Sequence, residues 1–418
     1  MSADDLMHRD LNRRQFLGRS AGIAVGAVGV GGGVVSAARS TVDTIGVGVV
    51  GVRRRGLQLA EAFAALPGVA VNHLCDVDAA VLGAAGQKLS QQGRPTPSMS
   101  ADVRAILEDP NVNVVVIATP DHWHTDLTLA ACAAGKDVYV EAPLTHSLAE
   151  SERLRKELDG TPQIVGCGLQ QRSCEHFQSA IDYVRSGQLG TVRLARAWAV
   201  ARRQSLPIQT APVVAPAGVD YSAWLGPMTH ADMTGVDAKT MRFSPQRFHH
   251  HWRWQWDFGS GELGTWGVHL LDVARWGLNV QRPLEVVATG GVLSGESAEE
   301  TPDTLHAQWT FSDAIIAWEH RSWTSHGVDG RSNGVAFHGD AGTLIVDRGG
   351  WKVYGQKEGA SAAATPLLEP HLMNFLEAVR SRTQPASPLE AALDSADLCH
   401  LANAAYRCGQ KLSLAALR

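Results

Sequence analysis

Short apolar strands alternate with helical segments between residues 44 and 168, and this alternation limits the fold more than any other feature of the chain. Runs typical of buried strands occupy 44–51, 69–75, 114–118, 138–140 and 161–165. Segments with the apolar spacing of helices lie between them, at 57–63, 78–91 and 127–134. Strands that alternate with helices pair in parallel and form a doubly wound α/β sheet. The pattern therefore predicts a first domain of this class over residues 41–168.

The pattern changes after residue 169, where strand-like runs follow one another. These runs are 192–200, 284–292, 304–311, 314–320, 333–339 and 343–347. Their clustering predicts a large, mostly antiparallel sheet. Helical patterns occupy 177–186, 371–380 and 389–414. Residues 169–418 are therefore expected to form a second, α+β domain, and a chain of 418 residues with 44% hydrophobic residues can build both cores.

The N-terminal 40 residues have the composition of an export signal. Arg13 and Arg14 stand in the twin-arginine pattern Asn-Arg-Arg-Gln-Phe-Leu, and a Gly/Ala-rich apolar run follows from 21 to 35. This run is short of the roughly 18–20 residues that a membrane span needs, so no stable span is expected, although an uncleaved anchor stays open. The segment predicts export by the Tat route, to the periplasm or the cell exterior. The net charge of −5 gives no field that would attract nucleic acid.

A glycine turn at the end of the first strand is a candidate site for a dinucleotide. A G-x-G-x-x-G pattern that begins at Gly46 lies inside the strand instead of after it. The segment from Gly51 to Gly56 is better placed, because a turn there would aim backbone N–H groups and a helix N-terminus at a diphosphate. Arg53 and Arg55 fall in this turn. Their guanidiniums can pair with phosphate, and a plain solvated turn is the alternative.

Two further strand ends carry candidate cofactor contacts. Asp76 follows the second strand about 20 residues after the glycine turn, where an acid binds a ribose 2′-hydroxyl and repels a 2′-phosphate. It therefore favours NAD, with NADP possible, and its alternative role is to cap the helix that follows. Thr119, Pro120, His122 and His124 form the turn after the central strand, which should face the same cofactor. The two histidines could instead be solvated turn residues.

Three separated segments carry a resemblance to a known family. They are the turn 119–124, the block Glu141-Ala142-Pro143-Leu144-Thr145 and the Gly-rich segment 259–272. Together they resemble the Gfo/Idh/MocA family of nicotinamide-dependent sugar oxidoreductases. The resemblance implies an N-terminal Rossmann domain, NAD as cofactor, a sugar or sugar derivative as substrate, and a C-terminal helix that packs back on the first domain. It also implies a homo-oligomer formed through the outer face of the second sheet.

Within this resemblance, the glycine turn departs from the family at one position. The family reads Gly-x-Gly-x-Arg-Gly, which Gly51, Arg55 and Gly56 match, while Arg53 replaces the second glycine. That glycine lets phosphates approach the backbone closely, so an arginine side chain there could crowd a diphosphate or pair with it. The family's Thr-Pro-x-x-x-His, which faces the cofactor, is matched by Thr119, Pro120 and His124.

Two positions of the reaction centre also depart from the family. The family reads Glu-Lys-Pro, with a lysine that touches cofactor and substrate, where this chain reads Glu141-Ala142-Pro143. The acid that the family places four residues before His269 is Thr265. The resemblance implies that His269 is the base, and a pKa near neutrality would suit that role. Losing a positioned acid–base group typically costs about 10²–10⁴-fold in rate. A buried helical histidine bonded to the backbone is the alternative for His269.

Candidate substrate contacts come from two segments. The aromatic segment 248–258 contains Trp254 and Asp257, and it resembles the Trp-x-Trp-x-x-Asp of exported members of the family. Aromatic faces suit the apolar faces of sugars, and core packing explains such residues equally well. Gln170 and Arg172 follow the last strand of the first domain, where the family places substrate contacts.

No metal site is predicted. The neighbouring histidines at 249–251 would point to opposite sides of an extended chain, and the six cysteines contain no C-x-x-C pair. The sequence thus predicts an exported NAD(P)-dependent oxidoreductase that transfers a hydride to or from a sugar. A relative that has lost catalysis and binds a sugar or a partner subunit is one alternative, because both Arg53 and Ala142 depart from the family. An enzyme that cleaves glycosides through transient oxidation, as some relatives do, is another.

Overall fold

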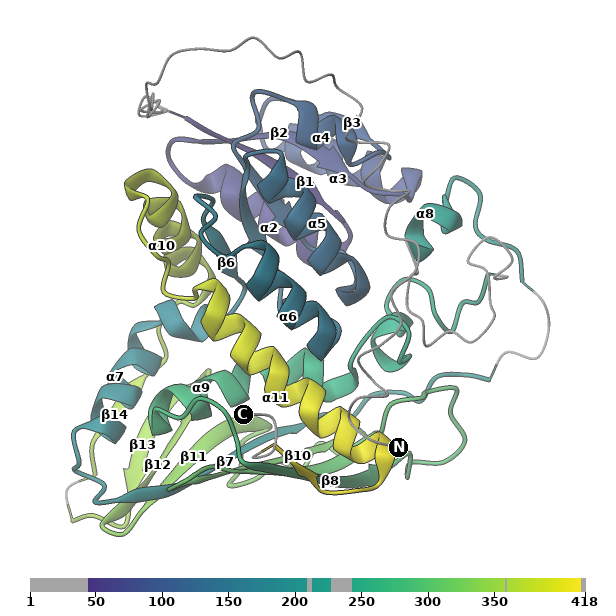
Figure 1. Cartoon of the computed structure of the whole chain (residues 1–418). Coiled ribbons are helices and arrows are strands. Elements are labelled where there is room, and N and C mark those ends of the chain that lie inside the picture. The colour runs from purple at the N-terminus through teal and green to yellow at the C-terminus, as the bar shows by residue number, and fades with distance from the viewer. Residues whose placement is uncertain (1–43, 209–212, 227–242, 358, 415–418) are drawn as a thin grey trace, which may run out of the picture.

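The chain forms two layered domains that meet along one side of each (Figure 1). The structure is a computed structural model, and it describes residues 44–208, 213–226, 243–357 and 359–414. The expected export signal at 1–40 lies outside these residues. Within the described part of the chain, no helix has both the length and the apolar character needed to cross a bilayer.

The first domain is a six-stranded parallel sheet with helices on its faces, which confirms the predicted fold class. The strands are β1 (Ile45–Val50), β2 (Val69–Cys75), β3 (Ser98–Ser100), β4 (Val114–Ile117), β5 (Asp137–Val140) and β6 (Val165–Cys167). Their order is β3-β2-β1-β4-β5-β6, so the winding reverses between β1 and β4. The helices are α2 (Arg54–Ala65), α3 (Ala79–Gln91), α4 (Arg104–Glu108), α5 (His124–Ala133) and α6 (Leu148–Glu157). Ligands of such sheets bind at this reversal, beside the carboxyl ends of the strands.

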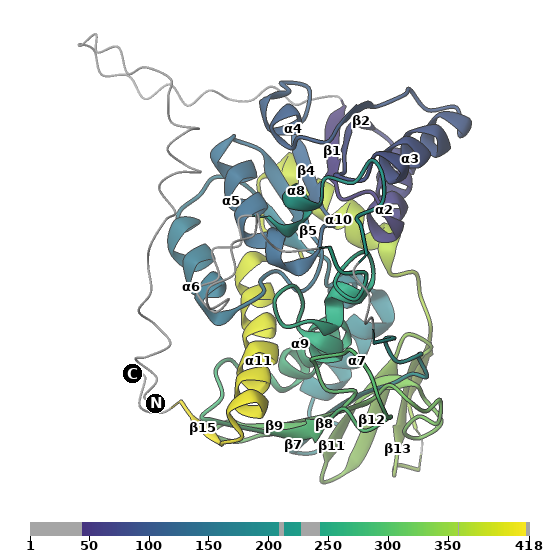
Figure 2. The same ribbon diagram turned by 90° about the vertical axis from the view of Figure 1, so that its right-hand side faces the viewer.

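The second domain is a nine-stranded sheet with helices on one face (Figures 1 and 2). Its strands are β7 (Val192–Val200), β8 (Glu285–Gly291), β9 (Thr304–Thr310), β10 (Ile315–Arg321), β11 (Asn333–Gly339), β12 (Gly342–Asp347), β13 (Gly350–Tyr354), β14 (Ser361–Ala363) and β15 (Leu412–Ser413). The order is β14-β13-β12-β11-β7-β10-β9-β8-β15, in which β7 and β10 pair in parallel and the other neighbours are antiparallel. The helices α7 (Glu175–Arg185), α9 (Val268–Leu278) and α11 (Leu389–Cys408) lie between this sheet and the first domain.

Two elements have boundaries that differ from those predicted from the sequence. The last strand of the first domain begins at Val165 rather than near 161, because Thr161 still closes the preceding helix by donating its N–H to the Leu158 carbonyl at 3.1 Å. The long C-terminal helix stops at Cys408, where Gly409 takes a left-handed φ of 65°. Residues beyond it pair with β8 as a short edge strand.

Helix α10 (Leu368–Ser381) returns from the second domain to the first. Its side chains Leu372, Phe375 and Leu376 share one buried core cluster with Leu59 and Phe63 of α2. This packing ties the two domains together on the side of the first sheet that carries α2 (Figure 2).

Candidate functional site

The turn between β1 and α2 requires glycine at both ends. Gly51 has a φ of 79°, and a Cβ there would lie 2.9 Å from the backbone of Ala118 and Thr119. A Cβ on Gly56 would lie only 1.7 Å from the Gly51 carbonyl oxygen. The ends of β1 and β4 therefore approach backbone to backbone. The N-terminus of α2 has no side-chain cap from Arg53 and no acidic residue in its first turn, so its positive end is open to an anion.

Arg53 occupies the position of the missing glycine without backbone strain. Its φ of −78° is ordinary for an L residue, and its guanidinium nitrogen Nη1 donates to Nδ1 of His249 in the second domain. The other ring nitrogen of His249 lies 3.7 Å from Asp78. Burial and the charge of Arg53 lower the pKa of His249 to about 4, so the imidazole is neutral and can accept this bond. The side chain of Arg53 thus reaches across to the other domain.

Asp76 holds the shape of the glycine turn. Its carboxylate accepts the N–H of Val52 at 2.8 Å and that of Asp78 at 3.0 Å, and burial raises its pKa. The helix that follows is capped by Asp78, which accepts from Ala80 and Val81. Asp76 therefore stands beside the turn as predicted from its position, and the capping role belongs to its neighbour.

The turn after β4 is fastened to the block after β5. His124 is 1% exposed, and its ring nitrogens lie 2.7 Å from the Pro143 carbonyl and 2.9 Å from the Thr119 carbonyl. Both nitrogens are engaged within the chain, so we assign His124 a positioning role. Among the described residues, the buried hydroxyl of Thr119 has no hydrogen-bond partner, and Pro120 leads into the short helical turn Asp121–Trp123.

The Glu141-Ala142-Pro143 block meets the start of α9 at the reaction centre. Glu141 forms an ion pair with Arg55 at 2.9 Å. A Cβ on Gly264 would lie 3.8 Å from the Pro143 ring, which shows how closely the helix start approaches the end of β5. Ala142 is partly buried and offers neither a proton nor a charge at this junction.

Thr265 lies in a π-type turn over Leu263–Gly267, and His269 lies in the first turn of α9, which follows it directly. Such turns are frequent at functional sites. The buried Nδ1 atom of His269 has no hydrogen-bond partner among the described residues. Burial, followed by the charges of Arg348 and Arg55, lowers the pKa of His269 to about 3. The expected pKa near neutrality was therefore wrong, because the sequence did not reveal how the fold buries this side chain and brings Arg348 and Arg55 near it.

The predicted substrate contacts are largely engaged within the protein. Arg172 makes a bidentate ion pair with the buried Asp272. Its Nε donates to Oδ2 and its Nη2 donates to Oδ1, each at 2.8 Å. Trp254 is 6% exposed and donates its indole N–H to Glu262 at 3.2 Å. Gln170 is also buried, at 6% exposed, whereas Asp257 is partly exposed. These contacts favour a supporting role for Arg172 and Trp254 over direct contact with a substrate.

Arg253 is a charged residue of the aromatic segment that was not predicted as a site residue. Its guanidinium lies 4.3 Å from the Trp252 ring and 3.2 Å from Nδ1 of His250. Burial lowers its pKa, while the carboxylates of Asp121, Glu262 and Glu141 act in the opposite direction. Arg253 therefore lies between the ends of β4 and β5 and the start of α9. The signal was its place between two tryptophans of a segment that was interpreted as sugar-binding or core-packing, from which only Trp254 and Asp257 were chosen as site residues.

Asp121 is a second missed residue of this junction. It is 5% exposed, and its carboxyl lies 3.3 Å from the hydroxyl of Ser260 at the Gly-rich helix start. Burial raises the pKa of Asp121 to about 8, so the carboxyl is largely neutral at pH 7.

An aromatic cover from the second domain lies against the cofactor side of the first. We use this name for Val219, Tyr221, Trp224, Phe248, Trp252 and Phe258. Next to it, the backbone of Ala79 donates to Gly218 at 3.0 Å and that of Asp220 donates to Val77 at 2.9 Å. The indole N–H of Trp123 donates to the Trp224 carbonyl at 3.1 Å. The cover therefore contacts the turns after both β2 and β4.

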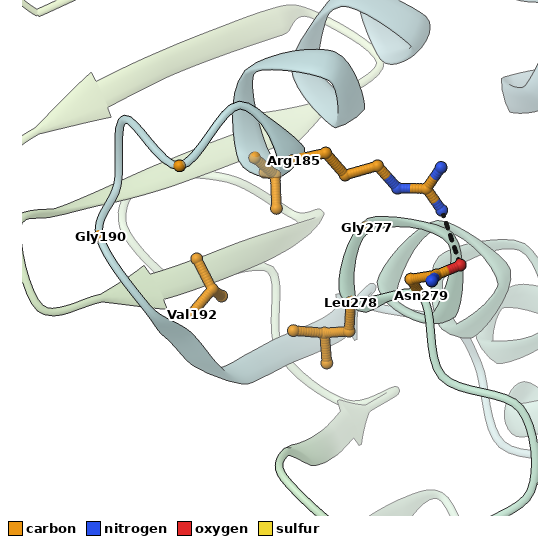
Figure 3. Close-up of a pocket in the computed structure, with 8 residues that line it drawn as sticks. Arg185, Gly190, Val192, Gly277, Leu278 and Asn279 are labelled. Atoms are coloured by element: carbon orange, nitrogen blue, oxygen red, sulfur yellow. Dashed lines mark hydrogen bonds between the residues drawn. The ribbon is translucent and has the colours of Figure 1, made fainter.

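A separate hollow lies away from these residues, at the ends of α7 and α9 (Figure 3). Arg185 reaches over it and donates to Asn279 at 3.4 Å, while small and apolar residues form the other walls. It contains none of the predicted site residues. Within the described ranges, no group of three or more His, Cys, Asp or Glu side chains is placed to hold a metal ion.

Comparisons with known proteins agree with the two-domain division. Residues 45–169 match the sequence profile of the oxidoreductase family with an NAD-binding Rossmann fold, and residues 229–345 match the GFO/IDH/MocA C-terminal domain. A glycosyl hydrolase family 109 protein of Saccharopolyspora erythraea is 28% identical over 205 residues, which are 44% of either chain. Another, from Shewanella sp. strain W3-18-1, is 31% identical over 124 residues, 29% of this chain and 27% of that one. The matches span less than half the length of these curated relatives.

Solved structures share the fold across almost the whole chain. A levoglucosan dehydrogenase in complex with NADH and levoglucosan superposes with a TM-score of 0.68 at 17% identity, covering 89% of this chain and 100% of that one. The aldose-aldose oxidoreductase from Caulobacter crescentus complexed with glycerol gives a TM-score of 0.68 at 18% identity, with the same coverage. At these identities the likeness concerns the fold alone. The two profile matches together cover more than half of the chain, and they fall on the parallel sheet and on the domain that supplies His269. The chain therefore belongs to the Gfo/Idh/MocA oxidoreductase family, and its first domain is an NAD-binding Rossmann domain.

Proposed function

We propose that the protein is an NAD(H)-dependent oxidoreductase that transfers a hydride to or from a carbon of a sugar or sugar derivative. The observation that carries this proposal is the junction of three elements at one edge of the first sheet. The ends of β4 and β5 meet the Gly-rich start of α9, through the contact of Asp121 with Ser260 and the approach of Gly264 to Pro143. Ligands of open α/β sheets bind at this edge.

The residues present fit a dinucleotide. The uncapped N-terminus of α2 and the exposed Arg54 beside it suit a diphosphate. The unpartnered Thr119 hydroxyl lies at the central strand end, where it could bond to the ligand. Asp76, whose two oxygens each retain a free lone pair, favours NAD, and NADP stays open to test. When bound, NAD supplies the hydride acceptor.

The chain's own groups supply the proton transfer. Oxidation of a sugar alcohol removes a hydride from the carbon and a proton from the hydroxyl. His269 is neutral throughout the physiological pH range and can accept that proton, although a pKa of about 3 makes it a weak base. Thr265 can hydrogen-bond to the hydroxyl, and Ala142 adds no charge that would stabilise an alkoxide. Turnover should therefore be slow.

We further propose that the cofactor is retained during purification. The aromatic cover and the Arg53–His249 bond join the second domain to the turns that surround the dinucleotide site. A ligand held at this contact can leave only if the domains separate there. Retention also suits an exported protein, since free nicotinamide nucleotides are scarce outside the cytoplasm. Export by the Tat route remains part of the proposal, and cell fractionation after replacement of Arg13 and Arg14 by lysine tests it.

The deciding experiment measures nucleotide and turnover on the same sample. Protein purified without added nucleotide is denatured, the released NAD(H) and NADP(H) are quantified, and sugar oxidation is assayed before and after Ala142→Lys. Ala142→Met is the matched control, because methionine adds length without charge. We expect bound NAD(H) in all three proteins and turnover that rises about 10²–10⁴-fold only in the lysine variant. Absence of nucleotide from every sample, together with no binding of added NAD, would favour a sugar-binding or assembly role.

A second candidate function is NAD-dependent cleavage of a glycoside. The observation that favours it is the name of the curated relatives reported above, which are glycosyl hydrolase family 109 proteins. Release of nitrophenol from a panel of nitrophenyl glycosides, with no net NADH formed, would support cleavage. Net NADH formation from free sugars would support the oxidoreductase. We propose a homo-oligomer in either case, which light scattering in solution tests.

A further inference from the structure

The guanidinium of Arg348, which belongs to the nine-stranded sheet of the second domain, lies near the predicted reaction centre. Arg348 stands in the turn between β12 and β13, and its guanidinium carbon lies 4.8 Å from the centre of the Trp266 ring. Trp266 precedes His269 by three residues, so the two side chains lie on the same side of the helix start. The influence of Arg348 on the pKa of His269, second only to burial, agrees with this placement.

The turn that carries Arg348 is fixed by its neighbour Asp347. The Asp347 carboxylate forms an ion pair with Arg331 at 2.7 Å and accepts the N–H of Gly349 at 2.7 Å. Its backbone carbonyl lies 3.0 Å from Nε2 of His176. The backbone under Arg348 is therefore held from three directions, which suits a group that positions a ligand.

Arg348 has no counter-charge in the described part of the chain. Burial and the nearby Arg55 lower its pKa, and no described carboxylate raises it. Two of the predicted site arginines differ in this respect, because Arg55 is paired with Glu141 and Arg172 with Asp272. Although its surroundings partly desolvate the guanidinium of Arg348, the residue as a whole is exposed at the surface, so a ligand can reach it. Because Glu141 balances the charge of Arg55, Arg348 leaves one uncompensated positive charge near His269.

We propose that the substrate is a sugar that carries a carboxylate, such as a uronic or aldonic acid, and that Arg348 binds this carboxylate. The planar fork of a guanidinium matches a carboxylate through two parallel hydrogen bonds. A bound carboxylate would also offset the repulsion between Arg348 and Arg55. This inference rests on the proposed function, because it names the substrate class of the same site.

The experiment compares acidic and neutral sugars of the same stereochemistry on the purified full-length protein with its retained nucleotide. Glucuronate is paired with glucose, and galacturonate with galactose. Binding is measured by calorimetry, and turnover by NADH absorbance. Of the two sugar acids, we expect the one that binds more tightly to exceed the affinity of its neutral counterpart roughly 10- to 100-fold, which is the usual effect of hydrogen bonds to a charged group. Its affinity should fall as salt is added.

Arg348→Gln should remove this preference and leave the weak binding of neutral sugars unchanged. Arg193→Gln is the matched control, because Arg193 is an exposed arginine whose side chain lies 3.6 Å from Asp340 at the far end of β7. Equal binding of acids and neutral sugars by the native protein would overturn the inference. The inference would also be overturned if Arg348→Gln lost the same affinity for acidic and for neutral sugars, or if that variant lost the retained nucleotide. Preference for glucose 6-phosphate over glucuronate would exclude the carboxylate.

The design separates this inference from the proposed function. Oxidation of neutral sugars without any preference for acids would leave the oxidoreductase standing and reject the carboxylate. A sugar acid could instead bind tightly through Arg348 while neither the native protein nor Ala142→Lys forms NADH from any sugar. That result would support carboxylate recognition and reject hydride transfer.

Discussion

At the scale of the residue, Asp121 shows how burial changes the chemistry of a family motif. Its carboxyl lies beside the Ser260 hydroxyl, and burial raises the pKa of Asp121 to about 8. The folded protein therefore holds a proton there that the unfolded chain releases near pH 3.9. Stability from this group is fully present below that value and is lost as the pH rises towards 8.

Asp121→Asn should remove this loss, because asparagine does not titrate and can still accept a bond from Ser260. We expect the thermal midpoint of the native protein to fall more between pH 6 and 9 than that of the variant, at about 2–4 °C per kcal/mol of lost stability. Scanning fluorimetry across this range measures the difference. Asp313→Asn, an exposed carboxylate in the β9–β10 turn, is the control and should follow the native curve. Parallel curves for the native protein and Asp121→Asn would contradict the assignment.

The sequence predicted the site residues that local motifs contain. Gly51 and Gly56 follow from the turn they must make, and Ala142 was recognised from the block around it. Arg253 and Arg348 were not predicted, because Arg253 fills a variable position of the Trp-x-Trp-x-x-Asp segment and Arg348 lies in no matched motif. Their surroundings depend on how the second domain folds over the first. The pKa of His269 was misjudged for the same reason, since burial and charges from other elements determine it.

At the scale of the element, the aromatic cover makes the next prediction. Trp224 is 7% exposed, stacks on Tyr221 at 5.6 Å and lies 5.0 Å from Phe258. Trp224→Ala would leave a cavity at its centre, and such truncations typically cost about 3–5 kcal/mol. We expect the cover to loosen and the retained nucleotide to dissociate at least tenfold faster.

The rate of nucleotide loss from desalted protein measures this effect. Trp323→Ala is the matched control, because Trp323 is 46% exposed and lies in the second domain just after β10. Nucleotide should leave this control at the native rate. Unchanged release from Trp224→Ala would show that the cover does not retain the cofactor.

Strands were predictable where a long apolar or alternating run marks them. The limits expected for β2, β7 and β11 match the structure for this reason. The strands β3 and β14 were missed, since each has only three residues, none of them buried. The two-residue β15 was missed as well, and so was β13, although three of its five residues are buried. The parallel pairing of β7 with β10 could not be predicted, because it joins residues more than 100 positions apart.

At the scale of the whole molecule, buried histidines couple the fold to pH. Burial lowers the pKa of His269 to about 3 and those of His371 and His400 to about 4. All three are neutral in the folded protein at pH 5, whereas in the unfolded chain they take up protons below about pH 6.5. Their stabilising effect is therefore complete above pH 6.5 and is lost as the pH falls from there towards 4.

Each histidine can contribute up to about 1.4 kcal/mol of lost stability per pH unit within this window. We expect the thermal midpoint to drop steeply between pH 6.5 and 4.5, and the drop to be shallower in His400→Gln. His400 lies 3.0 Å from the Thr145 hydroxyl, to which glutamine can also bond. His306→Gln, a change at an exposed histidine of β9, should keep the native slope. If His400→Gln had the native slope too, the acid sensitivity would come from other groups, and the buried histidines would not link the stability of this fold to pH.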